Sequence, residues 1–433
     1  MFKTLQNAFK IKDIRTKIFY TLMMLVVVRI GSQLPIPGVN RDYFSQWFSQ
    51  QTGDAFSFFN AVTGGSFLEM SVFALNITPY ITSSIIMQLL TIVIPKLEEM
   101  QKDGEDGRKK IASITRYVTV VLALIQAIAM AVGFGNKGLL QEFNFINVLT
   151  VIVALTAGSV FLMWIGERIT ENGVGNGISI VLLINIVSRI PADLGALFET
   201  FVKGKTLAYA ILAILIIAAV IILTTVLTVL LQGGERKISV QYAKKMQGRK
   251  MVGGQSTHIP LKVNTAGVIP IIFASSLLQF PVVIASLLGK SGSEWVKYLS
   301  SSNWCDPKNL KYSIGLLVYI ILVVFFAYFY TSITFNPLEV ANNLKKQGGF
   351  IPGIRPGTPT SDYLTKILNN IIFIGAVGLI IVAVIPIFFN GVFNAQVTFG
   401  GTSLIIIVGV VLETMKQIES QMLVRYYKGF LND

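Results

Sequence analysis

Apolar residues in this sequence gather in long runs instead of alternating with polar residues. Several runs are about 20 residues long, the length that a helix needs to cross the roughly 30 Å hydrocarbon core of a bilayer. Because hydrocarbon offers no hydrogen-bond partner to peptide groups, these runs are predicted to be transmembrane helices. They lie at residues 18–34, 71–94, 111–132, 145–164, 207–231, 265–288, 312–335 and 367–389.

Two further runs are weaker candidates for spans. Residues 178–190 form a short run that is expected to end at Pro191, and residues 402–422 contain charged side chains in their second part. The distribution of Lys and Arg decides both cases, because cytoplasmic loops of membrane proteins are enriched in these residues. Leaving out the run at 178–190 would place the most basic loop, 232–262, outside. The sequence therefore predicts ten spans, with both termini in the cytoplasm.

Composition agrees with a multi-pass membrane protein. Of 433 residues, 53% are hydrophobic and 13% are charged, whereas soluble proteins have roughly 25% charged residues. The formal net charge of +14 falls mainly on the predicted cytoplasmic loops, so it does not by itself indicate nucleic-acid binding. The first apolar run lacks a small-residue cleavage pattern, which favours a span over a signal peptide.

Residues that could perform chemistry are scarce. Cys305 is the only cysteine and His258 the only histidine. A disulfide within the chain is therefore excluded, and a metal or catalytic site built on several Cys and His ligands lacks its components. The sequence predicts neither an enzyme nor a cofactor.

The segment 55–67, AFSFFNAVTGGSF, is apolar and aromatic but too short to cross a bilayer. Gly64 and Gly65 weaken a helix and permit a bend. The segment is interpreted either as a half-helix that enters the protein from outside, where buried irregular backbone is tolerated, or as a helix on the outer surface. The residues alone leave both interpretations open.

Two spans have similar sequences. Pro79 precedes Ser83 and Ser84 in the second span, and Pro270 precedes a matching Ser-Ser pair in the seventh. Each span is the second of five, and five spans per half place the halves in opposite orientations, as in proteins with inverted repeats. We therefore expect an N-terminal half at 1–190, with spans one to five, and a C-terminal half at 191–433, with spans six to ten.

Polar residues in the middle of the spans are mostly uncharged, among them Asn76, Gln88 and Asn185, and hydrogen bonds between helices are their simplest interpretation. A pore through this protein would then have an aliphatic constriction, which stops ions by dewetting. A solute transporter, the main alternative, would place ionisable residues near the midplane. A membrane enzyme, the second alternative, would need a cluster of catalytic groups.

Two cytoplasmic loops, 232–262 and 336–366, are long and basic and contain Gly and Pro at intervals. Arg355 lies between Pro352 and Pro356, which favours a stiff turn. Such loops either dock a partner or only satisfy the topology rule and bind anionic lipid, and composition does not distinguish these roles.

Long motifs rich in Gly and Pro now identify a family. They include IGSQLPIPGV, ALNITPYITSSIIMQLL, FLMWIGERITENGVGNGISI, QSTHIPLKVNTAGVIPIIFASS and FNPLEVANNLKKQGGFIPGIRPG. Through them the sequence resembles the SecY family, the channel-forming subunits of the bacterial Sec protein translocon, almost from end to end. One departure is Asn76, where the family usually has Gly, and it affects the expected packing of the helix only locally.

The resemblance implies an all-α polytopic membrane protein with ten transmembrane helices. They would form two pseudo-symmetric, inverted five-helix halves, a clamshell around an hourglass pore in the bacterial cytoplasmic membrane. The implied function is to translocate secretory preproteins and to release signal sequences and membrane segments laterally into lipid. The implied partners are SecE-type and SecG-type small membrane subunits, the SecA motor ATPase, the ribosome, preprotein signal sequences and anionic lipids.

The resemblance also implies the site residues. The pore ring would be Ile77, Ile81, Ile178, Leu182, Ile272 and Ile406. The plug that fills the outer funnel would include Ala55, Phe56, Phe58, Phe59, Asn60, Gly64, Gly65 and Phe67. The lateral gate would be lined by Thr82 and Phe280, and the motor or ribosome would dock on Arg249, Lys250 and Arg355.

Overall fold

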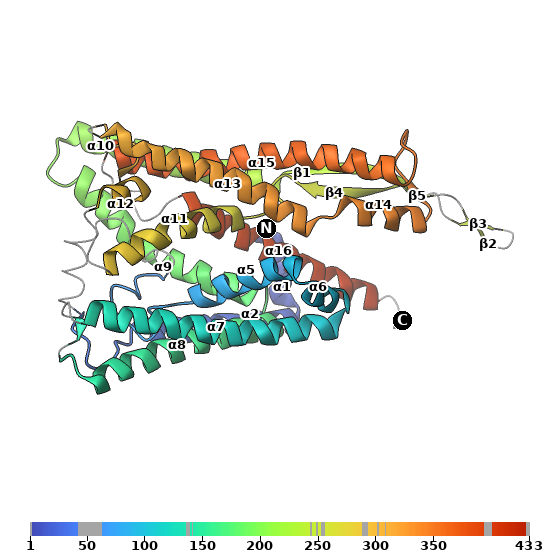
Figure 1. Cartoon of the computed structure of the whole chain (residues 1–433). Coiled ribbons are helices and arrows are strands. Elements are labelled where there is room, and N and C mark those ends of the chain that lie inside the picture. The colour runs from blue at the N-terminus through green and yellow to red at the C-terminus, as the bar shows by residue number, and fades with distance from the viewer. Residues whose placement is uncertain are drawn as a thin grey trace.

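The computed structural model is a bundle of long helices with a small β-sheet at one end (Figure 1). It describes residues 2–41, 63–135, 139–140, 142–242, 245–247, 250–252, 256–287, 293–300, 303–307, 309–393 and 401–429. The last described helix, residues 401–429, ends on the same side of the molecule as the sheet (Figure 1).

Each predicted apolar run overlaps one described helix. In chain order these helices are α2 (Lys12–Gly31), α5 (Thr78–Val93), α7 (Glu105–Phe134), α8 (Phe145–Asn172), α9 (Gly177–Phe201), α10 (Leu207–Gly233), α11 (Ile269–Leu287), α13 (Ile314–Thr334), α15 (Thr358–Phe393) and α16 (Gly401–Gly429). Shorter helices are α1 (Phe2–Lys10), α6 (Pro95–Lys102), α12 (Glu294–Leu299), the 3-10 helix η4 (Leu310–Ser313) and α14 (Pro337–Lys346).

Six stretches of the described residues are long and apolar enough to cross a membrane. They are α7, α8, α9, α10, α15 and the stretch Leu310–Lys346 that contains α13. The number becomes seven if α5 and α6, which meet at a bend of 102°, count as one span. The apolar stretch Ile269–Leu278 of α11 is shorter. A multi-pass helical membrane protein is thus confirmed, and the number ten stays a prediction.

Two predicted helix ends are wrong. The helix expected to stop at Pro191 continues as α9 to Phe201, because membrane helices tolerate proline where neighbouring groups satisfy the freed backbone. The predicted division of the chain after residue 190 falls inside this helix. The run expected to be helical from residue 71 forms turns as far as Ile77, and α5 begins only at Thr78.

Corresponding helices of the two predicted halves make corresponding contacts. Helix α7 packs on α5, and α13 packs on α11. The Thr119 hydroxyl on α7 donates to the Ser83 hydroxyl on α5 at 3.0 Å. Tyr319 on α13 hydrogen-bonds Ser275 on α11. The similar serines of the second and seventh spans therefore face the helix that follows each span, as expected for two related halves.

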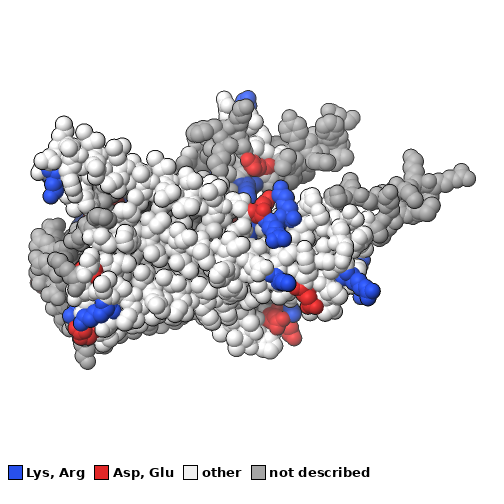
Figure 2. Space-filling view, turned by 90° about the horizontal axis from the view of Figure 1, so that it is seen from above, with Lys and Arg blue, Asp and Glu red and all other residues white. Residues whose placement is uncertain are grey.

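The outer faces of the helices are apolar. Helix α10 exposes Ile211, Leu215, Leu223 and Leu230, a pattern that suits contact with lipid chains and not with water. In the view of Figure 2, charged side chains gather toward the two ends of the molecule and leave a wide uncharged band between them. This band corresponds to the hydrocarbon layer expected from the sequence.

The two basic loops, 232–262 and 336–366, meet in one antiparallel sheet, and we call their described residues the cytoplasmic platform after the location that the sequence predicts for them. Its antiparallel sheet has the order β4 (Ser256–Lys262), β1 (Glu235–Tyr242), β5 (Gly349–Phe350). Strand β1 pairs with β4 through Ile238 and Ile259 and with β5 through Gln241 and Phe350. A second, two-stranded sheet contains β2 (Lys245–Gln247) and β3 (Lys250–Val252).

Gly158 sets how closely α8 approaches the turns before α5. A Cβ atom at Gly158 would collide with the carbonyl of Val72. We expect Gly158→Ala to lower the midpoint of thermal unfolding in detergent, because backbone has to move to relieve the overlap, at a cost of about 1–3 kcal/mol. In the control Gly195→Ala, on α9, the new methyl group meets nothing within 4 Å. The control should keep or slightly raise the midpoint, since Ala favours a helix over Gly.

Candidate functional site

A cluster of mostly aliphatic side chains occupies the place where α2, α8, α9 and α16 meet the beginnings of α5 and α11, and we call it the central aliphatic cluster. Five of the six predicted ring residues belong to it. Ile77 and Ile406 are fully buried in it, whereas Ile81, Ile178 and Ile272 pack at its edge and are partly buried. The sixth, Leu182, is buried on α9 but is not part of the cluster. Helices far apart in sequence thus bring aliphatic groups to one point.

Local structure orients these side chains. Ile77 is the N-cap residue of α5, and its carbonyl accepts a hydrogen bond from the backbone N–H of Ile81 in the first turn at 3.0 Å. Ile178 and Leu182 are four residues apart on α9, so they lie on one face of that helix. The start of α9 is fixed by Asn176, whose Oδ1 accepts hydrogen bonds from the backbone N–H of Ile178 at 3.1 Å and of Ser179 at 3.4 Å.

Only the end of the predicted plug lies in the described part of the chain. Ala55, Phe56, Phe58, Phe59 and Asn60 are outside it. Gly64 has φ +65° and Gly65 has φ +88°, conformations that glycine adopts without strain, so the bend expected from the sequence is confirmed. Phe67 is buried in a neighbouring apolar core.

Of the predicted lateral-gate residues, Thr82 lies partly buried on α5, and its hydroxyl donates to the carbonyl of Thr78 at 3.0 Å. Phe280 lies on α11, and its side chain is outside the described residues. Near their beginnings the two helices pack on the same cluster, the central aliphatic cluster, through Ile81 of α5 and Ile272 of α11.

Arg355 is exposed at the end of a fixed turn on the cytoplasmic platform. The Thr360 hydroxyl donates to the Arg355 carbonyl at 2.8 Å, and Ile354 anchors the turn on the platform's apolar core. No ion pair in the described part of the chain involves Arg355. The turn predicted from the prolines is confirmed, and its stiffness stays a prediction. Arg249 lies outside the described residues, and Lys250 begins β3.

Ion pairs lie at the ends of the first helices that are predicted to be cytoplasmic. The Arg116 guanidinium on α7 lies 2.7 Å from the Glu167 carboxylate on α8. Lys102 on α6 donates to Glu98 at 2.6 Å, and this hydrogen bond raises the pKa of the lysine. Among the described residues no cluster of Asp, Glu, His and Cys could hold a metal ion.

One buried polar contact borders the central aliphatic cluster. Nδ2 of Asn185 on α9 donates a hydrogen bond at 3.1 Å to Oδ1 of Asn76, which lies in the turn just before α5. The hydroxyl of Ser159 on α8 donates to the Asn76 carbonyl at 2.9 Å. The sequence predicted interhelix hydrogen bonds for both asparagines, and this is confirmed. That they bind each other was beyond the sequence, because only the fold brings them together.

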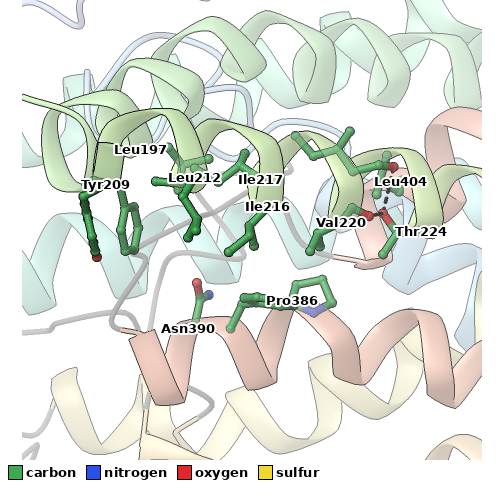
Figure 3. Close-up of a pocket in the computed structure, with 14 residues that line it drawn as sticks. Leu197, Tyr209, Leu212, Ile216, Ile217, Val220, Thr224, Pro386, Asn390 and Leu404 are labelled. Atoms are coloured by element: carbon green, nitrogen blue, oxygen red, sulfur yellow. Dashed lines mark hydrogen bonds between the residues drawn. The ribbon is translucent and has the colours of Figure 1, made fainter. Parts of the chain in front are cut away.

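An apolar groove of about 260 Å³ lies between α10 and α15, and nothing in the sequence indicated it. Figure 3 shows Leu212, Ile216 and Val220 on α10 directed toward Pro386 and Asn390 on α15. No charged side chain lines this groove. It suits an apolar occupant such as a lipid chain.

Comparison with known proteins identifies the family. The SecY family model matches residues 71–415. The chain belongs to the SecY family. The protein translocase subunit SecY of Halalkalibacterium halodurans is 47% identical over 438 residues, covering 100% of both chains. That of Bacillus subtilis is 44% identical over 444 residues, again covering 100% of both.

Solved structures show the same fold. A structure described as that of a protein conducting channel has a TM-score of 0.64 and 18% identity, covering 94% of this chain and 93% of its own. Sec61 in the canine ribosome-channel complex has a TM-score of 0.62, also with 18% identity, covering 94% and 93%. The clamshell of α-helices expected from the resemblance is therefore the fold of this SecY-family member.

The backbone explains the one departure from the expected SecY-family motif. Asn76 has φ +52°, a left-handed conformation that glycine adopts freely. Asparagine is among the few other residues that visit this region, because its short side chain can hydrogen-bond locally. The substitution therefore preserves the backbone and adds a polar side chain to the site.

The anchored turn of this SecY-family protein gives a second prediction. Thr360→Val should cost about 1 kcal/mol of local stability, the worth of a typical hydrogen bond. We expect faster amide hydrogen exchange around Ile354, measured by mass spectrometry, without a change in overall helicity. In the control Thr365→Val, the lost bond runs within α15 to the Ser361 carbonyl. Equal exchange around Ile354 in both variants would contradict the anchoring role of Thr360.

Proposed function

We propose that this chain is a protein-conducting channel of the bacterial cytoplasmic membrane, with both termini in the cytoplasm. It translocates secretory preproteins and releases signal sequences and membrane segments laterally into lipid. The observation that carries the proposal is the central aliphatic cluster, in which α2, α8, α9 and α16 meet the beginnings of α5 and α11 in a member of the SecY family. In this proposal the chain performs no chemistry, and a partner supplies the energy.

The ring closes the resting channel. Ile77, Ile81, Ile178, Leu182, Ile272 and Ile406 form an aliphatic collar from which water withdraws, so ions lose their hydration path. The plug, Ala55–Phe67 in the sequence, fills the outer side. An extended polypeptide displaces the plug and widens the collar, whose side chains then seal around it.

Lateral release uses the boundary between α5 and α11. Thr82 and Phe280 line this gate, and parting the two helices exposes a signal sequence to lipid. Burial of roughly 20 apolar residues in hydrocarbon drives the exit. The gate lies between the two five-helix halves, predicted from the sequence at 1–190 and 191–433. Because α9 runs to Phe201, the boundary between the halves moves to the loop at residues 202–206.

Partners approach from the cytoplasmic platform. Arg249, Lys250 and Arg355 dock a SecA-type motor ATPase or the ribosome, and the Sec61 structure described as part of a ribosome-channel complex supports a ribosomal partner. Contact with ribosomal RNA is electrostatic and therefore weakens with salt. SecE-type and SecG-type small subunits complete the channel, and the basic loops attract anionic lipids.

Arg355→Glu tests the channel and its docking surface together. Proteoliposomes would contain the protein, a SecE-type subunit, the motor ATPase and ATP, and protease protection of a secretory preprotein would be measured. Wild type should protect the preprotein in an ATP-dependent manner. Arg355→Glu should lose most of this protection, because a repulsive charge replaces an attractive one on a fixed turn.

The matched control is Lys205→Glu, which changes the net charge equally but lies in the loop between α9 and α10, at the opposite end of α10 from the platform. It should translocate like wild type. Equal loss in both variants would show a general charge effect. No protection by a folded wild-type complex with an active motor would favour a solute transporter instead.

Ile406→Asn tests the collar. A polar amide in the ring favours wetting, so the resting channel in a planar bilayer should conduct ions several-fold more than wild type. Val411→Asn, on the same helix but 39% exposed, should leave the conductance at the wild-type level. Low conductance in Ile406→Asn, with normal folding, would remove Ile406 from the ring.

A further inference from the structure

The amides of Asn76 and Asn185 share a buried hydrogen bond, and this pair, here called the amide pair, lies beside the central aliphatic cluster. Asn76 is 1% exposed and Asn185 is 2% exposed. Ile77, the residue after Asn76, is fully buried in the cluster, and Leu182 lies about one turn before Asn185 on α9. The amide pair therefore joins α5 to α9 next to the residues of the proposed ring.

The same pair contacts the end of the proposed plug. A Cβ atom at Gly64 would lie 2.8 Å from the Asn185 carbonyl oxygen and 3.0 Å from its Cα atom, so the Gly64 backbone rests directly on Asn185. Any movement of the plug end or of the start of α5 away from α9 must disturb this contact. One residue, Asn185, thus touches both parts that the proposed function requires to move.

The amide pair can stabilise a closed state without preventing the channel from opening. In apolar surroundings a hydrogen bond between amides is costly to leave unmade. However, Oδ1 of Asn185 has no hydrogen-bond partner among the described residues. Water that enters on opening would satisfy this acceptor and replace the lost bond. The hydrogen bond between the two amides therefore stabilises the closed state only while water is excluded from the site.

We propose that the amide pair is a latch that couples seating of the plug to closure of the ring, and so sets how apolar a signal sequence must be to open the channel. This inference rests on the proposed function and adds to it. Asn76 and Asn185 act as positioning residues, because they act through Ile77, Leu182 and Gly64 and need not touch the moving polypeptide.

The test uses Asn76→Gly, Asn185→Ala and the double variant in the complete complex. Asn76→Gly removes the amide without straining the backbone, so it is expected to fold even if Asn185→Ala does not. Each single variant should raise the resting ion conductance about fivefold, the effect of losing one hydrogen bond on the ratio of closed to open channels. Each should also translocate a preprotein whose signal sequence has been made less apolar.

The double variant distinguishes a coupled pair from two independent sites. If the two amides act through each other, its conductance should match that of the single variants and not the product of their effects. The control Ser83→Ala removes the buried hydrogen bond to Thr119, which holds α5 to α7 away from the pair. This variant should retain wild-type conductance and discrimination between signal sequences.

Three results would overturn the latch. They are wild-type conductance and signal selectivity in folded Asn76→Gly, multiplicative effects in the double variant, or an equal rise in Ser83→Ala. If wild type translocates preproteins while one of these results appears, the latch proposal is wrong and the proposed channel function is still supported. If wild type itself does not translocate with an active motor, the proposed function fails as well.

Discussion

The lack of hydrogen-bond partners in hydrocarbon constrains the structure of every segment that lies within the membrane. Backbone groups are satisfied within helices, and hydroxyl groups in the spans turn back on their own helix. Thr224, Thr228 and Thr331 donate to carbonyls four residues earlier. The irregular stretch 63–77 is tolerated at this depth because protein covers it, as the buried Met70 and Ser71 show.

A channel must satisfy this constraint and still admit a polypeptide. Charged groups along the path would bind ions and would need partners in the closed state, whereas aliphatic groups need none. In the proposed channel, the central aliphatic cluster therefore closes the path without leaving buried charge. Aliphatic contacts, however, have little directional preference, so they do not by themselves define one closed arrangement of the helices. The directional hydrogen bond between Asn76 and Asn185 supplies that definition at the same place.

The sequence predicted the helices well where one physical rule dominates. Apolar length located α7, α8, α10 and α15, because hydrocarbon thickness fixes that length. It failed at Pro191, where tertiary surroundings override the helix-breaking tendency of proline, and at the start of α5, where the left-handed Asn76 ends a series of turns.

Contacts between distant segments were harder to predict. The pairing of Gln241 with Phe350 joins two loops more than 100 residues apart, and no local pattern encodes it. The ring residues came from the family resemblance alone, since isoleucine is common throughout the spans. The meeting of five of them in one cluster depends on how several helices pack, as does the partnership of Asn76 with Asn185.

Because the two basic loops are joined in one sheet, a partner that docks on them can act on the helices that carry the sheet. Strand β1 follows α10 directly, and the apolar core of the platform includes Leu364 and Ile367 of α15. A Cβ atom at Gly375 on α15 would collide with the Val263 carbonyl at the end of β4, so sheet and helix are in direct contact. A partner bound at Arg355 therefore holds a rigid extension of the C-terminal half. Under the proposed function, its force moves α10 and α15 together with the platform. The N-terminal half, which contributes the amide pair and most of the proposed ring, does not move with the platform. Relative movement of the two halves, and not bending of a flexible loop, is then the step by which a cytoplasmic motor opens the channel.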